Sequence, residues 1–163
     1  MSDQRTHRVK DIFVEGAIHP TFIATSIAKH SIRTDIGAHE IFLGQVRADV
    51  VGADRQVTSI EYTAYRDMAL EAMALIREEA FARWPSITCL HVHHSLGVVR
   101  AGELCFMVFA SAPHRVQARE AVAWLVDRIK AELPIFGKEV FSDATHVWKV
   151  NRNEAAPGHT TDH

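Results

Sequence analysis

The sequence predicts a single α+β domain in which a mixed or antiparallel sheet packs against two long helices. Three observations favour this class. The chain has 163 residues, which suits one domain; its strand-like runs come in bunches; and two long helical patterns separate them. Both ends are polar and lack apolar periodicity, so we expect tails at 1–10 and 152–163 around a folded domain of 11–151.

The first third of the chain predicts mostly strands with one short helix. Residues 12–17 predict a short first strand, and Pro20 lies at the start of a predicted helix that continues through Ala28. Apolar and polar residues alternate over 37–46, which is typical of a strand. A Gly-Ala-Asp turn at 52–54 then joins two extended runs into a hairpin or a loop-connected strand pair.

Two longer helices lie in the remaining sequence. We expect Asp67 to cap the first and Pro85 to end it. Its apolar stripe is spaced four, three, four and four residues apart: Ala69, Met73, Ile76, Ala80 and Trp84. The second opens after Ser111-Ala112-Pro113 and closes before Pro134. Its apolar face comprises Ala118, Val122, Leu125, Ile129 and Leu133.

Strand patterns surround the second helix. The runs 87–99 and 103–112 predict two strands separated by Arg100-Ala101-Gly102. A last extended segment covers 140–141 and 146–150. The strands therefore flank the helices without the regular alternation of a doubly wound sheet.

Composition excludes several classes of protein. The 18 basic and 20 acidic residues give a net charge of −2, so neither nucleic acid nor an anionic membrane is an expected partner, and any anion site must be local. Cys89 and Cys105 lack CxxC spacing, which argues against disulfides and zinc knuckles. No apolar run suits a signal peptide or a membrane span, so we expect a soluble protein of the reducing cytoplasm.

The 11 histidines are the unusual count, and three lie on one predicted strand. His91 and His93 would share a face, with His94 on the other. The local sequence lacks a third ligand, so half-buried structural histidines are favoured, and we expect neither a metal nor a cofactor. Cys89 and Cys105 are interpreted as buried, inert thiols.

His114 and Arg115 lie at the predicted start of the second long helix. Free backbone N–H groups and the helix dipole favour an anion there, and two basic side chains would complete a phosphate cradle. A solvated helix start is the equally weighted alternative.

Lys130 stands near the other end of that helix, at the edge of the apolar face. Apolar surroundings would make it a usable base, nucleophile or anion holder; the alternative is a surface lysine paired with Asp127. Position 114 is roughly 24 Å from position 130 along a helix, so one small substrate can meet both only if they come from different subunits.

Five segments and one tryptophan resemble the MoaE family, the large, catalytic subunits of molybdopterin synthase. They are GAHEIFLGQVR (37–47), IEYTAYRDMA (60–69), HSLGVVRAGE (94–103), SAPHRVQAREA (111–121), DRIKAELPIFGKE (127–139) and Trp148. The resemblance implies an α/β-hammerhead-type fold and a homodimer that carries one small, ubiquitin-like MoaD-type subunit at each end. It also implies that the carrier's Gly-Gly thiocarboxylate gives its sulfur to cyclic pyranopterin monophosphate, forming the molybdopterin dithiolene without a catalytic cysteine in this chain.

The same resemblance assigns roles to single residues. Lys130 matches the lysine central to catalysis. Arg47, His114 and Arg115 match substrate-binding residues, the last two acting from the neighbouring subunit. Phe42, Phe136 and Gly137 match the channel for the carrier's tail.

Two departures from the family pattern bear on function. The family's second active-site lysine falls on Gly137, and we expect Lys138 to take a supporting catalytic role because glycine lets the backbone turn. Ser95 stands where many relatives have arginine, so that arginine's role is not carried over. The loss at Gly137 keeps open a non-catalytic docking subunit for the carrier, and the histidines leave a metal hydrolase as a third hypothesis.

Overall fold

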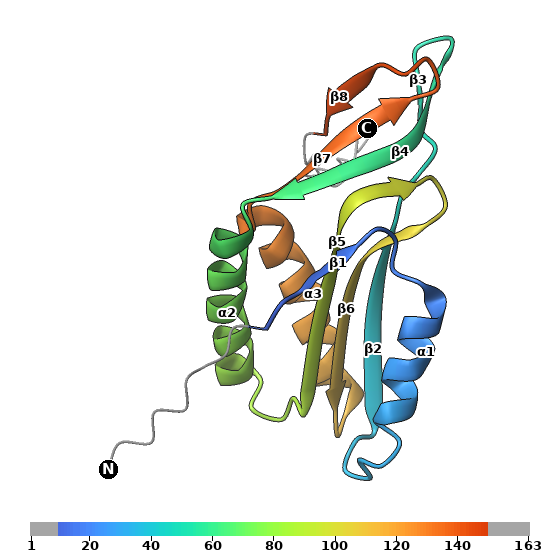
Figure 1. Cartoon of the computed structure of the whole chain (residues 1–163). Coiled ribbons are helices and arrows are strands. Elements are labelled where there is room, and N and C mark those ends of the chain that lie inside the picture. The colour runs from blue at the N-terminus through green and yellow to red at the C-terminus, as the bar shows by residue number, and fades with distance from the viewer. Residues whose placement is uncertain (1–9, 150–163) are drawn as a thin grey trace, which may run out of the picture.

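The computed structural model describes residues 10–149. Most of the two expected tails, and Val150, lie outside these residues. The elements run in the order shown in Figure 1. Their bounds are β1 Phe13–Glu15, α1 Pro20–Lys29, β2 Ala38–Gln45, β3 Val50–Val51, β4 Arg55–Ala64, α2 Arg66–Arg83, β5 Cys89–Arg100, β6 Leu104–Ala112, α3 Arg115–Glu132, β7 Ile135–Phe141 and β8 His146–Trp148.

One mixed sheet organises the described residues. Its main path is β2-β6-β5-β4-β7-β8, with every neighbouring pair antiparallel, while β1 pairs parallel with β5 and β3 pairs with β4. The long strand β5 joins the two parts of the sheet, because residues 89–94 pair with β6 and residues 97–100 pair with β4. The predicted α+β class is confirmed, the strand pair around the turn at 52–54 is a hairpin, and the two strands predicted on either side of Arg100-Ala101-Gly102 pair antiparallel.

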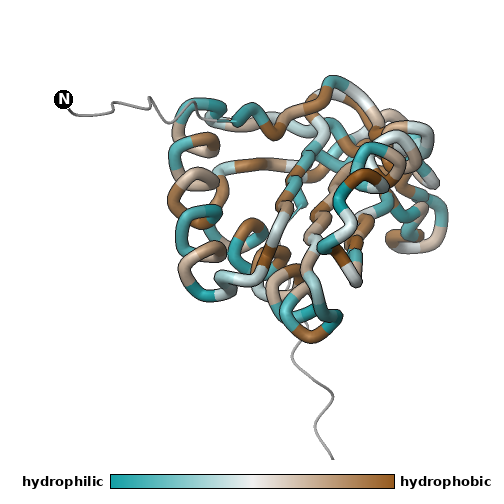
Figure 2. Tube along the Cα trace, turned by 90° about the horizontal axis from the view of Figure 1, so that it is seen from below, coloured by the Kyte–Doolittle hydropathy of each residue, from teal (hydrophilic) through white to brown (hydrophobic). Residues whose placement is uncertain are grey.

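The helices cover the sheet unequally. The 18-residue helices α2 and α3 lie together on one face, and α1 lies on the other (Figure 1). The predicted stripes of α2 and α3 are buried from Ala69 to Ala80 and from Ala118 to Ile129. Each fully buried aliphatic side chain contributes about 1.5–3 kcal/mol, so this larger core dominates stability. Figure 2 shows apolar and polar residues interspersed along both helices and strands, as expected for elements with one face in a core.

A smaller core lies under α1. Ile18, Met107 and Phe109 are almost completely buried there, and three partly buried side chains pack against them: Ile23, Ile41 and Leu104. The sheet is therefore apolar on both faces where α1 crosses it.

The predicted start of α2 needs a correction. Tyr65, not Asp67, holds the N-cap position, and its side chain makes no capping hydrogen bond. The backbone N–H of Tyr65 donates to the Pro134 carbonyl, so β4 passes directly into the helix beside the start of β7. Asp67 lies in the first turn, where its charge complements the helix dipole. None of the helices among residues 10–149 is long and apolar enough to span a membrane.

Candidate functional site

Four aromatic side chains form a ring cluster on the side of the sheet that faces α3. The ring centroids of Phe42 and Phe106 are 5.7 Å apart, those of Phe106 and His94 are 5.3 Å apart, and those of His94 and Tyr62 are 5.0 Å apart. The sheet register produces this row, since Phe106 is the pairing partner of His94 and Phe42 pairs two residues further along β6. The cluster thus connects β2, β6, β5 and β4.

Lys130 places a positive charge beside the ring cluster. It lies in the last turn of α3, where a cation complements the helix dipole. Its Nζ is 5.9 Å from the Phe42 ring centroid, and its charge lowers the pKa of His94 after the larger effect of burial. Lys130 is solvent-exposed, so an anionic ligand can reach its ammonium group from outside.

His94 is held as a neutral imidazole. Its Nδ1–H donates to the Ser95 carbonyl at 2.8 Å, which leaves Nε2 as the unprotonated nitrogen. Burial lowers the pKa of His94, so the ring stays uncharged at neutral pH beside the Lys130 ammonium. Ser95 is fully buried. An arginine at this position, as in many relatives, would have no exposed surface for its charged group.

A β-bulge brings Cys105 to this side of the sheet. The register between β2 and β6 shifts at Gly44/Gln45, and Cys105 then joins the core beneath α3 together with Phe106. Its thiol donates to the Gly44 carbonyl at 3.5 Å. Burial raises the pKa of Tyr62 well above its usual range, with Cys105 contributing a hydrogen bond. Tyr62, His94 and Cys105 are site residues that the sequence analysis did not assign to the site.

Gly137 faces the ring cluster across β4. It pairs with Tyr62, and a Cβ atom at this position would lie 3.3 Å from Tyr62 Cε1 and 3.0 Å from Ile60 Cγ2. A side chain at position 137 would therefore point toward Tyr62. Glu139 follows on the same face of β7, and its charge also acts on Tyr62.

Lys138 points to the opposite face of β7. Its Nζ lies 3.1 Å from Glu61 Oε2, and the strand stays regular because β4 and β8 pair with it on both sides. The backbone turn that Gly137 would permit does not occur. Lys138 was expected to reach the same pocket as Lys130. Its side chain instead points to the other face of β7, toward Glu61.

Phe136 lies on that outer face too. Its side chain is 44% exposed, and its ring is 5.5 Å from Tyr65 in a groove that also includes Trp148. Of the three expected channel residues, Phe42 belongs to the ring cluster, Gly137 faces it, and Phe136 lies in the exposed aromatic groove.

Three other predicted site residues are basic: Arg47, His114 and Arg115. Arg47 follows β2 and forms an exposed ion pair with Asp49 at 3.2 Å. His114 is the N-cap of α3 and Arg115 is its first residue, and both are exposed. Because α3 is continuous, Arg115 and Lys130 are separated by about 22 Å along its axis within one chain.

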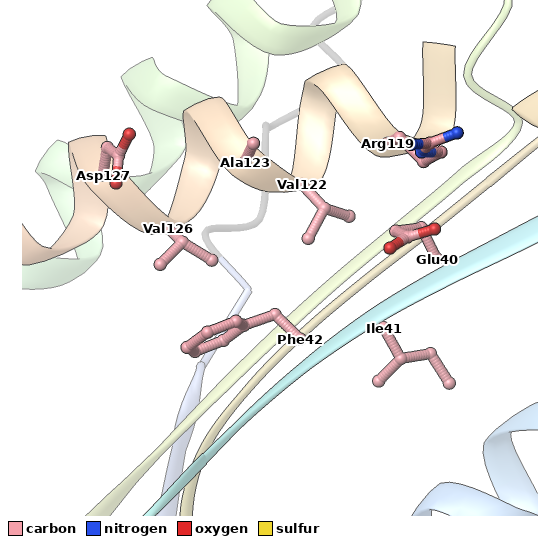
Figure 3. Close-up of a pocket in the computed structure, with 8 residues that line it drawn as sticks. All are labelled: Glu40, Ile41, Phe42, Arg119, Val122, Ala123, Val126 and Asp127. Atoms are coloured by element: carbon pink, nitrogen blue, oxygen red, sulfur yellow. The ribbon is translucent and has the colours of Figure 1, made fainter. Parts of the chain in front are cut away.

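A groove runs between the edge strand β2 and α3. In Figure 3, Phe42 points toward Val126 and Glu40 lies opposite Arg119. Phe42 therefore lines the groove on one side and the ring cluster on the other. The remaining lining residues are Ile41, Val122, Ala123 and Asp127.

Fold and site together define an α+β chain with an accessible lysine at the end of a long helix, next to partly buried rings and a groove lined by apolar and charged side chains. The family model described as MoaE protein matches residues 18–132, and the chain belongs to this family.

Similarity to individual proteins agrees with this assignment. The molybdopterin synthase catalytic subunit of Drosophila virilis is 41% identical over 116 residues, covering 71% of this chain and 33% of that protein. The chain thus spans about a third of the length of this relative. The catalytic subunit of Taeniopygia guttata is 37% identical, with 71% and 73% covered.

Two solved structures share the fold. The crystal structure of molybdopterin synthase from Staphylococcus aureus matches with a TM-score of 0.74 and 27% identity, over 86% of this chain and 98% of that one. A protein–protein complex of subunits 1 and 2 of the molybdopterin-converting factor from Helicobacter pylori matches with a TM-score of 0.73 and 18% identity, over 86% and 90%.

Proposed function

We propose that this chain is the catalytic subunit of a molybdopterin synthase. It transfers sulfur from the thiocarboxylated C-terminus of a small, ubiquitin-like MoaD-type carrier to cyclic pyranopterin monophosphate, and two transfers complete the dithiolene. Family membership supports the proposal, and the observation that carries it is the position of Lys130, an accessible cation 5.9 Å from the Phe42 ring and beside neutral His94.

Lys130 is the central catalytic residue in this proposal. Its ammonium orients the anionic thiocarboxylate and stabilises the negative charge that develops as sulfur leaves the carrier. The neighbouring rings exclude part of the solvent, which strengthens that interaction. The unprotonated Nε2 of His94 provides a nearby proton acceptor.

The tail of the carrier approaches along Phe42 and Gly137, and Phe136 contacts the carrier from the outer face. Because the partner supplies the sulfur, no reactive cysteine is required near Lys130, and the positions of the two described cysteines agree with this. Cys105 is buried and donates its thiol to a backbone carbonyl, and Cys89 is on a strand end outside the ring cluster. In this proposal the reaction needs no cysteine nucleophile from this chain.

Substrate binding combines residues of two subunits. His114 and Arg115 hold the phosphate of the pyranopterin at the start of α3, where free N–H groups favour an anion, and Arg47 adds a further positive charge. The length of α3 separates these residues from Lys130 of the same chain, so the complete site lies across the interface of a homodimer. With one carrier at each end, the assembly is a heterotetramer in the cytoplasm.

A non-catalytic docking subunit is the second candidate, favoured by Gly137 at the position of the family's second lysine. Incubation of the purified chain with thiocarboxylated carrier and cyclic pyranopterin monophosphate separates the two. We expect conversion of the pterin to the dithiolene. Stable carrier binding without any conversion would instead establish the docking role.

A further inference from the structure

Three potential metal ligands meet on the face of the sheet that α1 covers. They are His30, the C-cap residue of α1, and Cys89 and His91 from β5. Their ligand atoms all lie within 4.8 Å of one another. The proposed sulfur transfer uses none of these side chains, which we call the His–Cys triad.

The two imidazoles already have the spacing of ligands to one ion. His30 Nε2 and His91 Nε2 are 3.3 Å apart. Two nitrogens bound tetrahedrally to zinc at about 2.0–2.1 Å are separated by about 3.3 Å, and a nitrogen and a sulfur by about 3.5 Å. A side-chain adjustment of about 1.3 Å or less at Cys89 therefore completes a three-ligand site.

Surrounding contacts orient both rings toward each other. His30 Nδ1–H donates to the Ser26 carbonyl at 2.5 Å, so Nε2 carries the lone pair. This is the outer hydrogen bond that fixes the tautomer of many metal-bound histidines. The buried Phe109 ring packs edge-on against His30 at 5.1 Å and stacks with His91 at 5.8 Å.

The Arg77 side chain lies near the His–Cys triad, and its charge acts on His91. The Arg77 guanidinium is fixed by a 2.6 Å hydrogen bond to the Leu90 carbonyl, next in sequence to Cys89.

We propose that His30, Cys89 and His91 bind one Zn²⁺ ion, with water in the fourth position. Nitrogen and sulfur ligands in this combination suit zinc. On binding, the Cys89 thiol releases its proton to solvent, and the proton of His91 moves from Nε2, where it donates to His30 in the metal-free chain, to Nδ1. The ion would join the end of α1 to the central strand β5.

The test uses the complete, EDTA-treated chain and Co²⁺ as a spectroscopic probe for the zinc site. We expect one equivalent of Co²⁺ to produce the thiolate-to-cobalt charge-transfer band and the visible bands of a tetrahedral site, and Zn²⁺ to remove them. At a free Zn²⁺ concentration of about 100 times Kd, the melting temperature should rise by about 5–10 °C.

Matched variants assign the ligands. Cys89→Ser should abolish the charge-transfer band, and His91→Gln should weaken binding at least tenfold. The controls are Cys105→Ser, the other described cysteine, and His93→Gln, which lies on the same strand face but packs against Phe22 at 4.7 Å. Both controls should keep the band.

The absence of the band in the wild-type chain, or a band that survives in Cys89→Ser, would overturn the proposal. Far-UV circular dichroism of each metal-free variant checks folding. Should Cys89→Ser misfold, His30→Gln at the exposed end of α1 replaces it as the deciding variant, with loss of cobalt binding expected. Sulfur-transfer activity does not enter any of these measurements.

Discussion

Replacing Lys130 by alanine tests the catalytic assignment quantitatively. An ammonium about 4 Å from a thiocarboxylate contributes about 1 kcal/mol in bulk water and about 4 kcal/mol at the effective dielectric constant near a protein surface. The Phe42 ring 5.9 Å from Nζ and the partly buried His94 exclude water on one side, whereas the other side of Lys130 is exposed. We therefore expect a loss of about 2–4 kcal/mol of transition-state stabilisation, or about 30- to 1,000-fold in rate.

The assay is dithiolene formation in a single turnover with saturating thiocarboxylated carrier, so that the chemical step is observed and not binding. Lys138→Ala is the matched control, because that ammonium is on the other face of β7 and pairs with Glu61. The control should keep its rate within about threefold of wild type, because Lys138 lies on the face of β7 away from the ring cluster, and losing its ion pair with Glu61 affects mainly stability. A Lys130→Ala rate within threefold of wild type, or an equal loss in Lys138→Ala, would refute the reasoning.

Three further predictions concern binding and stability. Arg115→Ala should raise KM for cyclic pyranopterin monophosphate about tenfold with little change in kcat, because the proposed role of Arg115 is to hold the anionic substrate. A constant KM in steady-state kinetics would contradict this role. Burial lowers the pKa of His94 in the folded chain. The unfolded chain therefore binds a proton at this residue below about pH 6.5, where the folded chain still does not, and the free energy of unfolding should fall as the pH drops from 7.5 to 5. Thermal melts of His94→Gln should show a shallower fall, and an unchanged slope would count against a buried neutral ring. Leu125→Ala removes a fully buried side chain of α3 and should destabilise the fold by about 3 kcal/mol in urea titrations, where a loss below 1 kcal/mol would show that the core collapses around the gap.

The order of the elements was predictable because each helix and strand carries its own periodic signal. The stripe from Ala69 to Ala80 has a helical period, and Pro134 ends α3 in the sequence and in the structure. The cap of α2 was predicted at the wrong residue, because the contact between Tyr65 and the Pro134 carbonyl is tertiary and leaves no local pattern. Local propensity favours Asp67 there, and the packing of β4 against β7 overrides it.

The site was predictable only in part, since it depends on register between distant strands. Lys130 could be recognised from its motif, but the row from Phe42 to Tyr62 forms through pairings across β2, β6, β5 and β4. The β-bulge that directs the Cys105 side chain into the core beneath α3 has no sequence signature in this segment. Lys138 was predicted on the wrong face because the pairing on both sides of β7 keeps the simple alternation of a strand.

The His–Cys triad shows what a search for local ligand motifs misses. The expectation of no metal was based on His91 and His93, which share a strand face but lack a third ligand nearby. Cys89 precedes His91 by two residues and so shares its face, a signal that was available in the sequence. The contribution of His30 from the end of α1 could be found only from the fold.

A structure of this chain with the thiocarboxylated or carboxylate form of the carrier bound would test the central claim most directly. The account predicts that the carrier's terminal glycine lies between Phe42 and Gly137, with its carboxylate or thiocarboxylate within hydrogen-bonding distance of Lys130 Nζ. A terminal glycine bound on the outer face, beside Lys138 and Phe136, would contradict it.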